Sequence, residues 1–369
     1  MKKTGITILF ISLLIGIGSC RVIKYNPEVK LINRVFTKVE IENFIKDSTL
    51  NIRALEIYDS IGPAYLTSKG EFGVIYPNSL FNHIDSLKDR PHHFHKVSLS
   101  NDTLKLNFRA LGVTKKRGFG INIGSPVFLY SLDADLEKNK VVYQENHPKA
   151  FYDSMDFWND NEGIAIGDST DGCLSIIITR DGGNTWTKLS CNNLPKGIEN
   201  EGAFAASDTN ISIIGDNTWV ATTAGRIYFS PDKGENWEVF DTPIVKEKET
   251  EGIYSIVFYD EFNGFAIGGD YTEPDDNAAN KIRTTDGGKT WQLVAQNQNP
   301  GYRSCVQYIP KRHGKELVTV GFKGIDYSND SGNTWKHLSN EGFYTIRFLN
   351  DSVAYAAGAG RISKIIFRE

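Results

Sequence analysis

Short apolar segments recur along the chain and alternate with polar stretches that contain glycine. The apolar segments are rich in β-branched and aromatic residues and end at turn residues, which is the pattern of β-strands. No heptad and no long helical period follows the first twenty residues. The pattern therefore predicts an all-β protein.

Seven apolar segments are expected to be the inner strands of repeated units: residues 52–58, 108–113, 154–158, 203–207, 253–258, 304–309 and 345–349. A second strand is expected after each of them, at residues 63–67, 119–123, 163–166, 219–222, 264–267, 317–320 and 353–356. The last unit ends with a third strand at residues 361–367, and its unpaired edge would expose the sheet to aggregation. Residues 29–41 have strand composition, so we expect them to pair with this unit and close the array.

One polar phrase, Ser/Thr-x-Asp-x-Gly-x-x-Trp, occurs four times, at residues 179–186, 230–237, 284–291 and 328–335. Its recurrence every 44 to 54 residues matches the length of a four-stranded unit. In each copy we expect the Asp to accept hydrogen bonds from amides two or three residues on, the Gly to take a positive φ, and the Trp to pack beneath the turn. These structural residues are Asp181, Gly183, Trp186, Asp232, Gly234, Trp237, Asp286, Gly288, Trp291, Asp330, Gly332 and Trp335.

The phrase is what is called an Asp-box (BNR repeat), and it follows Phe157-Trp158-Asn159-Asp160 and the string GIAIGD at 163–168. This block resembles the photosystem II stability/assembly factor family of Asp-box propellers and its bacterial relatives, well over 150–369 and more weakly before. With seven expected inner strands, the fold expected at 21–369 is a single seven-bladed β-propeller of four-stranded antiparallel blades, and the resemblance implies a scaffold or assembly role. Asp-boxes are shared with sialidases, xyloglucanases and sortilin-type receptors, so they indicate fold better than activity.

The first twenty residues form a separate element. Lys2 and Lys3 precede an apolar run at residues 6–17, and Cys20 ends a small-residue cleavage site. Such a segment is typical of an export signal too short to span a membrane. It resembles a bacterial lipobox, which implies cleavage and a lipid anchor on Cys20; the alternative is an ordinary secretory signal. Because Arg21 replaces a retention-type acidic residue, the resemblance implies an outer-membrane lipoprotein of the cell envelope, facing the periplasm or the cell surface.

The charge of the chain argues against nucleic-acid binding, and its cysteines permit one disulfide. The 41 Lys and Arg and the 45 Asp and Glu are interspersed and give a net charge of −4, so there is no basic footprint for nucleic acid. If Thr179 pairs with Thr185, Cys173 and Cys191 face each other across a hairpin, where an oxidising compartment permits a disulfide. Whether that disulfide forms stays open at this stage. Cys305 is expected to be a small buried hydrophobic residue.

The loops of a four-stranded up-and-down blade alternate between two faces. Loops that join strands 1 to 2 and 3 to 4, the Asp-boxes included, share one face, whereas 2-to-3 loops and blade-to-blade connections share the other. We expect function on the second face, where inner strands begin around the central channel and loops are free to vary. The residues expected to meet there are Arg53, Arg109, Asp153, Glu201, Glu251, Arg303 and Tyr344 at the inner-strand starts, and Asp168 and Asp270 on 2-to-3 loops.

This set of charges permits two interpretations. The arginines could hold a carboxylate or an anionic sugar, or the charges could satisfy one another as a salt-bridge ring around a wet channel. The first hypothesis is a monomeric, lipid-anchored binding or assembly module whose partner is a protein or glycan of the cell envelope. The alternative is a glycoside hydrolase or polysaccharide lyase, with arginines holding the sugar and two carboxyl groups as acid and base. The candidates are Arg53, Arg109 and Arg303 for the first role and Asp153, Glu201 and Glu251 for the second.

Sialidases also combine Asp-boxes with an arginine cluster, a Tyr/Glu pair and an acid in the channel mouth. This chain departs from them in having seven units in place of six. The nearest string to their N-terminal Arg-Ile-Pro phrase is Ile52-Arg53-Ala54. No sialidase residue is therefore carried over to this sequence.

Two segments resemble metal sites by composition alone. His92, His93 and His95 are close in sequence, but His92 and His93 would point to opposite faces of a strand, which favours a solvated outer strand. Residues 270–277 are an acidic insertion with oxygens suited to calcium, yet they lack the spacing and glycine of an EF-hand loop. No metal and no cofactor is expected.

Overall fold

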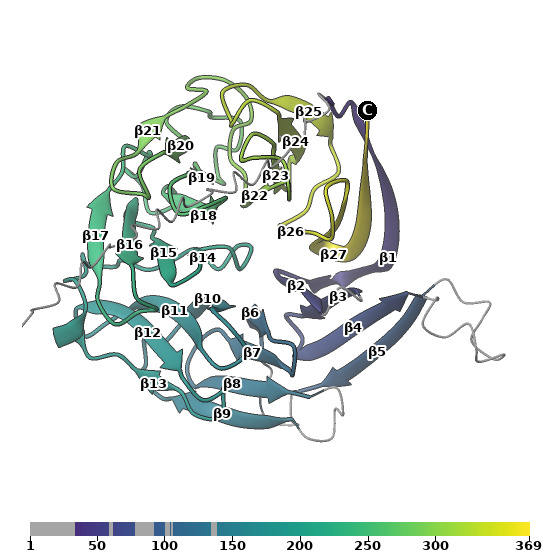
Figure 1. Ribbon diagram of the computed structural model, residues 1–369. Helices are drawn as coiled ribbons and strands as arrows, with labels where there is room; N and C mark the ends of the chain where they lie inside the picture. The colour runs from purple at the N-terminus through teal and green to yellow at the C-terminus, as the bar shows by residue number, and fades with distance from the viewer. Residues whose placement is uncertain (1–33, 59–61, 78–91, 100–103, 105, 134–138) are drawn as a thin grey trace, which may run out of the picture. The chain divides into compact units, whose positions relative to one another are not determined.

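The computed structural model describes residues 34–58, 62–77, 92–99, 104, 106–133 and 139–369. These residues belong to one compact unit, 34–369, in which seven antiparallel sheets surround a common centre (Figure 1). Each sheet has its inner strand nearest the centre. The all-β, seven-bladed β-propeller predicted from the strand pattern is therefore confirmed. No helix within the described ranges has the length and apolar character needed to cross a membrane.

Six of the blades are consecutive four-stranded meanders. Blade 1 contains β2 (Ala54–Tyr58), β3 (Gly62–Leu66), β4 (Glu71–Pro77) and β5 (His92–Ser98); blade 2 contains β6 (Phe108–Val113), β7 (Gly118–Asn122), β8 (Val127–Leu132) and β9 (Lys140–Glu145). Blade 3 contains β10 (Tyr152–Phe157), β11 (Gly163–Thr170), β12 (Cys173–Thr179) and β13 (Thr187–Lys188); blade 4 contains β14 (Ile211–Ile214), β15 (Asn217–Ala221), β16 (Arg226–Ser230) and β17 (Glu238–Asp241). Blade 5 contains β18 (Ile253–Phe258), β19 (Gly264–Gly268), β20 (Lys281–Thr284) and β21 (Gln292–Leu293); blade 6 contains β22 (Cys305–Tyr308), β23 (Leu317–Gly321), β24 (Gly324–Ser328) and β25 (Lys336–Ser339).

Blade 7 joins the two ends of the described chain. It is built from β26 (Thr345–Phe348), the long element β27 (Val353–Arg368) and β1 (Lys38–Asn51). The first part of β27 pairs with β26 and the second part with β1, and the amide of Phe367 donates to the carbonyl of Ser352 at 2.9 Å, so β27 folds back on itself and supplies two strands.

An N-terminal strand therefore closes the ring, as predicted, but its position was predicted too early in the chain. The strand begins at Lys38, residues 34–37 are not in a strand, and residues 29–33 lie outside the described residues. The predicted signal segment at 1–20 lies outside them as well.

The four copies of the polar phrase, here called the repeat turns, share one hydrogen-bond pattern. In the first copy Gly183 N donates to Thr179 Oγ1 at 2.9 Å, and Thr185 N donates to Asp181 Oδ1 at 2.9 Å. The other three copies repeat both bonds. Each aspartate thus accepts the amide four residues on, and Asp232 also accepts that of Glu235, three residues on and within the expected range, at 3.1 Å.

The glycine of each repeat turn meets two requirements at once. Gly183 has φ of 76°, and a Cβ on it would lie 2.2 Å from the ring of Phe119 in blade 2. Gly332 has φ of 83°, and its Cβ would lie 2.2 Å from Phe265 in blade 5. Only glycine accepts both the left-handed backbone and the close approach. The repeat turns therefore fasten each blade against the preceding one.

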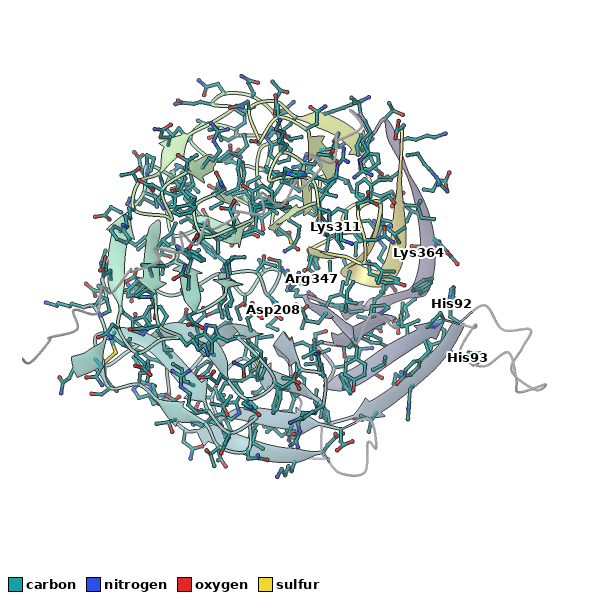
Figure 2. All side chains as sticks on the ribbon, viewed as in Figure 1. His92, His93, Asp208, Lys311, Arg347 and Lys364 are labelled. Atoms are coloured by element: carbon teal, nitrogen blue, oxygen red, sulfur yellow. A yellow bond between two sulfur atoms is a disulfide. The ribbon has the colours of Figure 1, made fainter. Side chains whose placement is uncertain are left out.

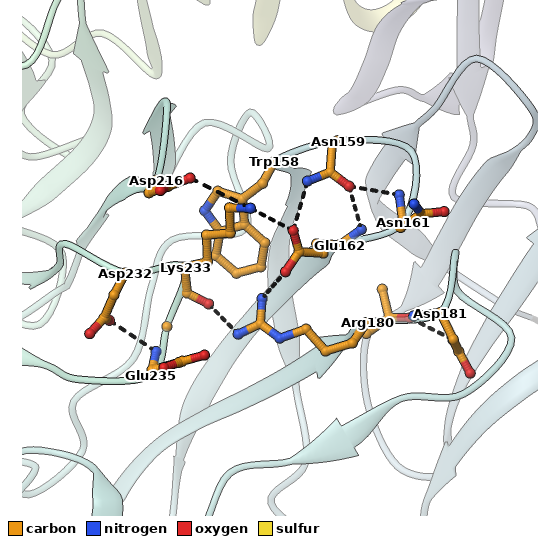
Figure 3. A network of polar contacts seen from close by, with 12 residues as sticks. Trp158, Asn159, Asn161, Glu162, Arg180, Asp181, Asp216, Asp232, Lys233 and Glu235 are labelled. Carbon is orange, nitrogen blue, oxygen red and sulfur yellow. Dashed lines mark hydrogen bonds and ion pairs between the residues drawn. The ribbon is translucent and has the colours of Figure 1, made fainter.

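Charged residues on the repeat-turn face also join blades 3 and 4 (Figure 3). Glu162 accepts hydrogen bonds from Arg180 Nη1 at 2.9 Å and from Lys233 Nζ at 2.6 Å. The guanidinium of Arg180 lies 5.2 Å from the ring centroid of Trp158, and the indole of Trp158 donates to Thr218 at 2.7 Å. The charges of this network neutralise one another across the blade boundary.

Blade 3 carries a disulfide between Cys173 and Cys191. The geometric reason given for it was wrong, because β12 pairs Ile177 with Lys188, one residue from the assumed register, and Cys191 lies in a 3₁₀ turn, η3 (Cys191–Asn193). Cys305 is buried and free.

The inner strand of blade 4 was predicted in the wrong place. Residues 203–207 are not a strand; β14 begins at Ile211. Residues 203–210, here called the plug, instead enter the centre of the ring, where Asp208 lies near Arg347 (Figure 2). The alanines and the phenylalanine of this segment resemble a strand in sequence, but Ala203 and Ala206 are buried by the hub and not by a sheet.

The plug bonds to blades on several sides. The carboxylate of Asp208 accepts the amides of Leu111 in blade 2 at 2.7 Å and of Met155 in blade 3 at 3.1 Å. The carbonyl of Asp208 accepts from Arg347 Nη2 of blade 7 at 3.0 Å. Thr209 Oγ1 donates to Ser255 of blade 5 at 2.8 Å. One short loop thereby fixes the relative positions of opposite blades.

Candidate functional site

A cavity of ≈ 590 Å³ lies on the face formed by 2-to-3 loops and inner-strand starts. This cavity, here called the mouth, brings together Arg53, Arg109, Asp168 and Tyr344, four of the residues expected at the site. A second pocket of ≈ 630 Å³ adjoins the mouth and shares Asp168 with it. The plug forms part of the mouth's lining. The expected face of the propeller is therefore hollowed around charged side chains.

The two arginines of the mouth end on backbone carbonyls of the plug. Arg53 Nη1 donates to the carbonyl of Ala206 at 3.0 Å, and Arg109 Nη1 donates to that of Ala205 at 2.9 Å. Arg53 also lies 4.0 Å from the ring centroid of Tyr344, while its Nε is buried without a hydrogen-bond partner. Among the described residues, neither arginine forms an ion pair with a carboxylate. Both keep guanidinium donors for a ligand.

Burial of these arginines disfavours their charge. Desolvation, aided by the neighbouring charge of Arg53, lowers the pKa of Arg109 to about 10. Desolvation also lowers the pKa of Arg53, opposed by the neighbouring tyrosines. Both side chains are still cationic at neutral pH, and an incoming anion would relieve the repulsion between them.

Two aspartates of blade 3 lie beside the arginines. Burial raises the pKa of Asp168 to about 6. Asp153 is completely buried, neither of its carboxyl oxygens has a hydrogen-bond partner, and burial together with Asp168 raises its pKa well above the ordinary value. Burial thus disfavours the charged form of Asp153, which lies beneath the surface of the site.

Glu201 is enclosed by partners of its own. Its Oε1 accepts from Arg226 Nε at 3.0 Å and from Thr222 Oγ1 at 2.9 Å. Its Oε2 accepts from the hydroxyl of Tyr228 and the amide of Ile198, both at 3.0 Å. This buried cluster fixes the connection between blades 3 and 4.

Arg303 differs from the other two predicted arginines. Its Nε and Nη2 both reach Asp326 Oδ2, at 2.7 and 2.6 Å, and Asp326 Oδ1 contacts His337 Nδ1 at 2.9 Å. Sequence alone places Arg53 and Arg303 at equivalent positions, before the inner strands of blades 1 and 6. The structure separates them, because only Arg303 has an aspartate from β24 within reach.

Glu251 and Asp270 hold loops near the mouth. Glu251 Oε2 accepts the amides of Glu247 and Lys248 at 2.7 and 3.1 Å. Asp270 accepts the amide of Thr272 at 2.8 Å and contacts Lys248 Nζ at 3.2 Å. Although burial opposes it, these hydrogen bonds lower the pKa of Asp270. Both acids have local structural partners.

An aromatic wall on the side of blades 5 and 6 was missed by sequence reasoning. It consists of Tyr254, Tyr271, Tyr302 and Phe322, all of which line the mouth. A signal was present, because Tyr302 lies three residues before the inner strand of blade 6 and Phe322 directly follows the second strand of that blade. Those are the positions at which the loops of this face begin.

The segments with a metal-like composition have other contacts. Within the described ranges no group of His, Cys, Asp and Glu is placed to hold a metal ion. His92 lies in the outer strand β5, where its Nε2 contacts Glu42 Oε1 at 3.0 Å (Figure 2). In the acidic insertion, Asp275 pairs with Lys323 at 3.1 Å.

Comparison with known proteins supports the fold alone. No family model and no curated protein matches the chain. Among solved structures, YCF48 bound to a D1 peptide is similar with a TM-score of 0.62 and 12% identity, covering 94% of this chain and 100% of that one. The WD40 repeats of RRP9 are also similar, with a TM-score of 0.60 and 10% identity over 90% of this chain and 99% of that one. U3-55K is similar with a TM-score of 0.60 and 11% identity over 89% of this chain and 98% of that one. All of these neighbours share the propeller architecture of this chain.

Proposed function

We propose that this protein is a polypeptide-binding propeller whose mouth holds an acidic group of its partner between Arg53 and Arg109. The observation that carries the proposal is the pair of half-buried guanidinium groups that face the mouth and, among the described residues, form no ion pair with a carboxylate. A bound carboxylate would supply the missing counter-charge through short, charge-assisted hydrogen bonds. The similar YCF48 structure, which is bound to a peptide, agrees with a polypeptide ligand.

The proposal extends to the place and role of the protein. Cleavage before Cys20 and lipidation of that cysteine would tether the propeller to the outer membrane, where a rigid disc suits a scaffold or assembly role. The resemblance of residues 150–369 to the photosystem II stability/assembly factor family supports this role. A Cys20→Ser variant should leave the membrane fraction, and a variant that stays there in carbonate-washed membranes would contradict lipid anchoring.

Hydrolysis of a glycan has less support than binding. Of the three carboxyl groups nominated as acid or base, Asp153 is sealed from the surface, and Glu201 and Glu251 are bound to neighbours. A retaining or inverting glycosidase needs two carboxyl groups that face the sugar.

The test uses fluorescent peptides that contain one Glu or, as the control, one Gln. The purified protein should bind the Glu peptides, and Arg53→Met or Arg109→Met should weaken that binding about 10- to 100-fold, the effect of losing one or two hydrogen bonds to a charged group. Arg180→Met on the repeat-turn face is the matched control and should leave binding unchanged. Equal binding of Glu and Gln peptides, or release of sugar from anionic oligosaccharides offered in parallel, would overturn the proposal.

A further inference from the structure

The aromatic wall of the mouth has a graded exposure. Tyr254 and Tyr302 are buried at its base, whereas Tyr271 is 49% and Phe322 43% exposed at its rim. Phe204 of the plug stacks on Tyr254 with ring centroids 3.7 Å apart. The rim therefore offers aromatic surface to a ligand on a base that is already packed.

The rings of the wall enclose a notch. Tyr302 lies 4.8 Å from Tyr254 at an interplanar angle of 89° and 6.4 Å from Tyr271 at 67°. Phe322 lies 5.5 Å from Tyr302 with the planes tilted by 34°. Rings set at such angles form a concave apolar surface that fits a bulky side chain, while a pyranose ring would need one flat, open aromatic face.

The loops that carry the rim are fixed before any ligand arrives. The loop of Tyr271 is joined to the loop of Phe322 by the ion pair of Asp275 with Lys323 at 3.1 Å. The amide of Tyr302 donates to the carbonyl of Pro274 at 3.0 Å. Little loop ordering is left for binding to bring about, which favours affinity.

From these contacts we infer that the aromatic wall binds a large apolar side chain, aromatic or aliphatic, of the same peptide whose acidic group reaches Arg53 and Arg109. The inference rests on the proposed function and adds a sequence requirement to it: the partner carries an acidic residue and, within a few residues, a bulky apolar one. Tyrosine, phenylalanine and arginine around one cavity are the residues that dominate binding energy at protein interfaces. The arginine side of the mouth selects the acidic residue of the peptide, and the aromatic side selects the bulky apolar residue near it.

The experiment uses sets of four peptides of one length, which combine Glu or Gln with Phe or Ala. One set is made for each spacing, with the Phe or Ala placed one, two, three or four residues from the Glu or Gln. We expect the Glu/Phe peptide to bind about tenfold tighter than the Glu/Ala peptide at the best spacing. Phe322→Ala and Tyr271→Ala should abolish that advantage without changing the affinity for Glu/Ala, and Phe322→Leu should retain most of it.

Phe262 provides the matched control. It is 55% exposed in the same blade as Tyr271, in the 1-to-2 loop on the opposite face, so Phe262→Ala should change no peptide affinity. If Glu/Phe and Glu/Ala bind equally at every spacing, or if Phe322→Ala weakens both peptides alike, the inference is overturned while the acidic anchor stands. If Arg53→Met has no effect on either Glu peptide, the proposed function itself fails. Binding of neutral oligosaccharides that Phe322→Ala removes would also overturn the inference.

Discussion

The two faces of the propeller use charge in opposite ways. On the repeat-turn face, Glu162 pairs with Arg180 and Lys233 across the boundary of blades 3 and 4, and Asp216 supplies a second negative charge beside Lys233. On the mouth face, Arg53 and Arg109 end on backbone carbonyls, with no carboxylate partner in the part of the chain that the structure describes. A charge that is paired holds blades together, whereas a buried charge left beside a cavity lowers stability until a ligand neutralises it.

The same contrast exists within the mouth face. Arg303 lies against Asp326, so it belongs with the paired charges although it begins an inner strand just as Arg53 does. Position in the blade therefore does not decide the role of an arginine. The presence of a carboxylate on the third strand of the same blade decides it.

The largest expected loss of stability lies on the repeat-turn face. Trp186 is buried against Phe119 and Phe157, at centroid distances of 6.0 and 5.9 Å, so Trp186→Ala should lower the free energy of unfolding by about 3–5 kcal/mol. Chemical denaturation measures this loss. Peptide affinity of the folded fraction should not change, and a loss below about 1 kcal/mol would mean that the turn does not brace the blades.

Breaking the paired arginine should be nearly as costly. Asp326→Asn leaves the guanidinium of Arg303 buried without its counter-charge, and we expect a loss of about 3 kcal/mol in the free energy of unfolding. The double variant Arg303→Met/Asp326→Asn should recover part of that loss. If the single variant unfolds like the parent protein, Arg303 is not a structural charge and the contrast with Arg53 is lost.

Asp168 on the mouth face and Asp181 on the repeat-turn face should change the stability of the fold in opposite directions as pH falls. The folded-state pKa of Asp168 is raised from 3.8 to about 6, so its ionised carboxylate lowers stability at pH 7. Stability rises as pH falls from 7 to 4, because the folded protein takes up a proton that the unfolded chain does not. Asp168→Asn should remove about 1 kcal/mol of that gain, after allowance for solvent screening.

The repeat turns provide the comparison for that measurement. Partial burial tends to raise the pKa of Asp181, but hydrogen bonds from Thr185 outweigh it and lower that pKa. The contribution of Asp181 to the stability of the fold is therefore lost as pH falls below about 4. Denaturation midpoints of the parent protein and Asp168→Asn, followed from pH 7 to pH 3, test both signs. Identical profiles for the two proteins would contradict the assignment for Asp168.

The smallest change is expected for the unpaired arginine. Arg53→Met removes a buried charge that has no ion pair and keeps the apolar stem, so the free energy of unfolding should stay within about 1 kcal/mol of the parent value. Thermal and chemical unfolding measure it alongside the loss of peptide affinity. A loss above about 2 kcal/mol would place Arg53 among the structural charges.

The sequence predicted the architecture because the repeat turns are local. Thr179 and Asp181 specify a hairpin through hydrogen bonds to the amides of Gly183 and Thr185, each four residues on, and the same phrase marks blades 3 to 6. The plug was mistaken for a strand because burial by the hub and burial by a sheet select the same small apolar residues. The closing strand was placed too early because strand composition extends on both sides of residue 38.

The site was predicted only in part, for a physical reason. Arg53, Arg109, Asp168 and Tyr344 meet because the ends of inner strands and second strands converge on one face. What distinguishes Arg303 from them is a contact with another strand, which no local pattern encodes. The aromatic wall is likewise assembled from two blades, and its members are ordinary loop residues until the ring closes.

The pairing of β1 with β27 also sets the order in which this protein can mature. The strand nearest the start of the described chain must wait for the last strand to leave the ribosome before blade 7 exists. Arg347, which steadies the plug carbonyl of Asp208, belongs to that same blade. A nascent chain that still lacks β27 would thus have its other sheets but an unsupported hub, and the peptide binding proposed for the mouth would arise only after that strand is made.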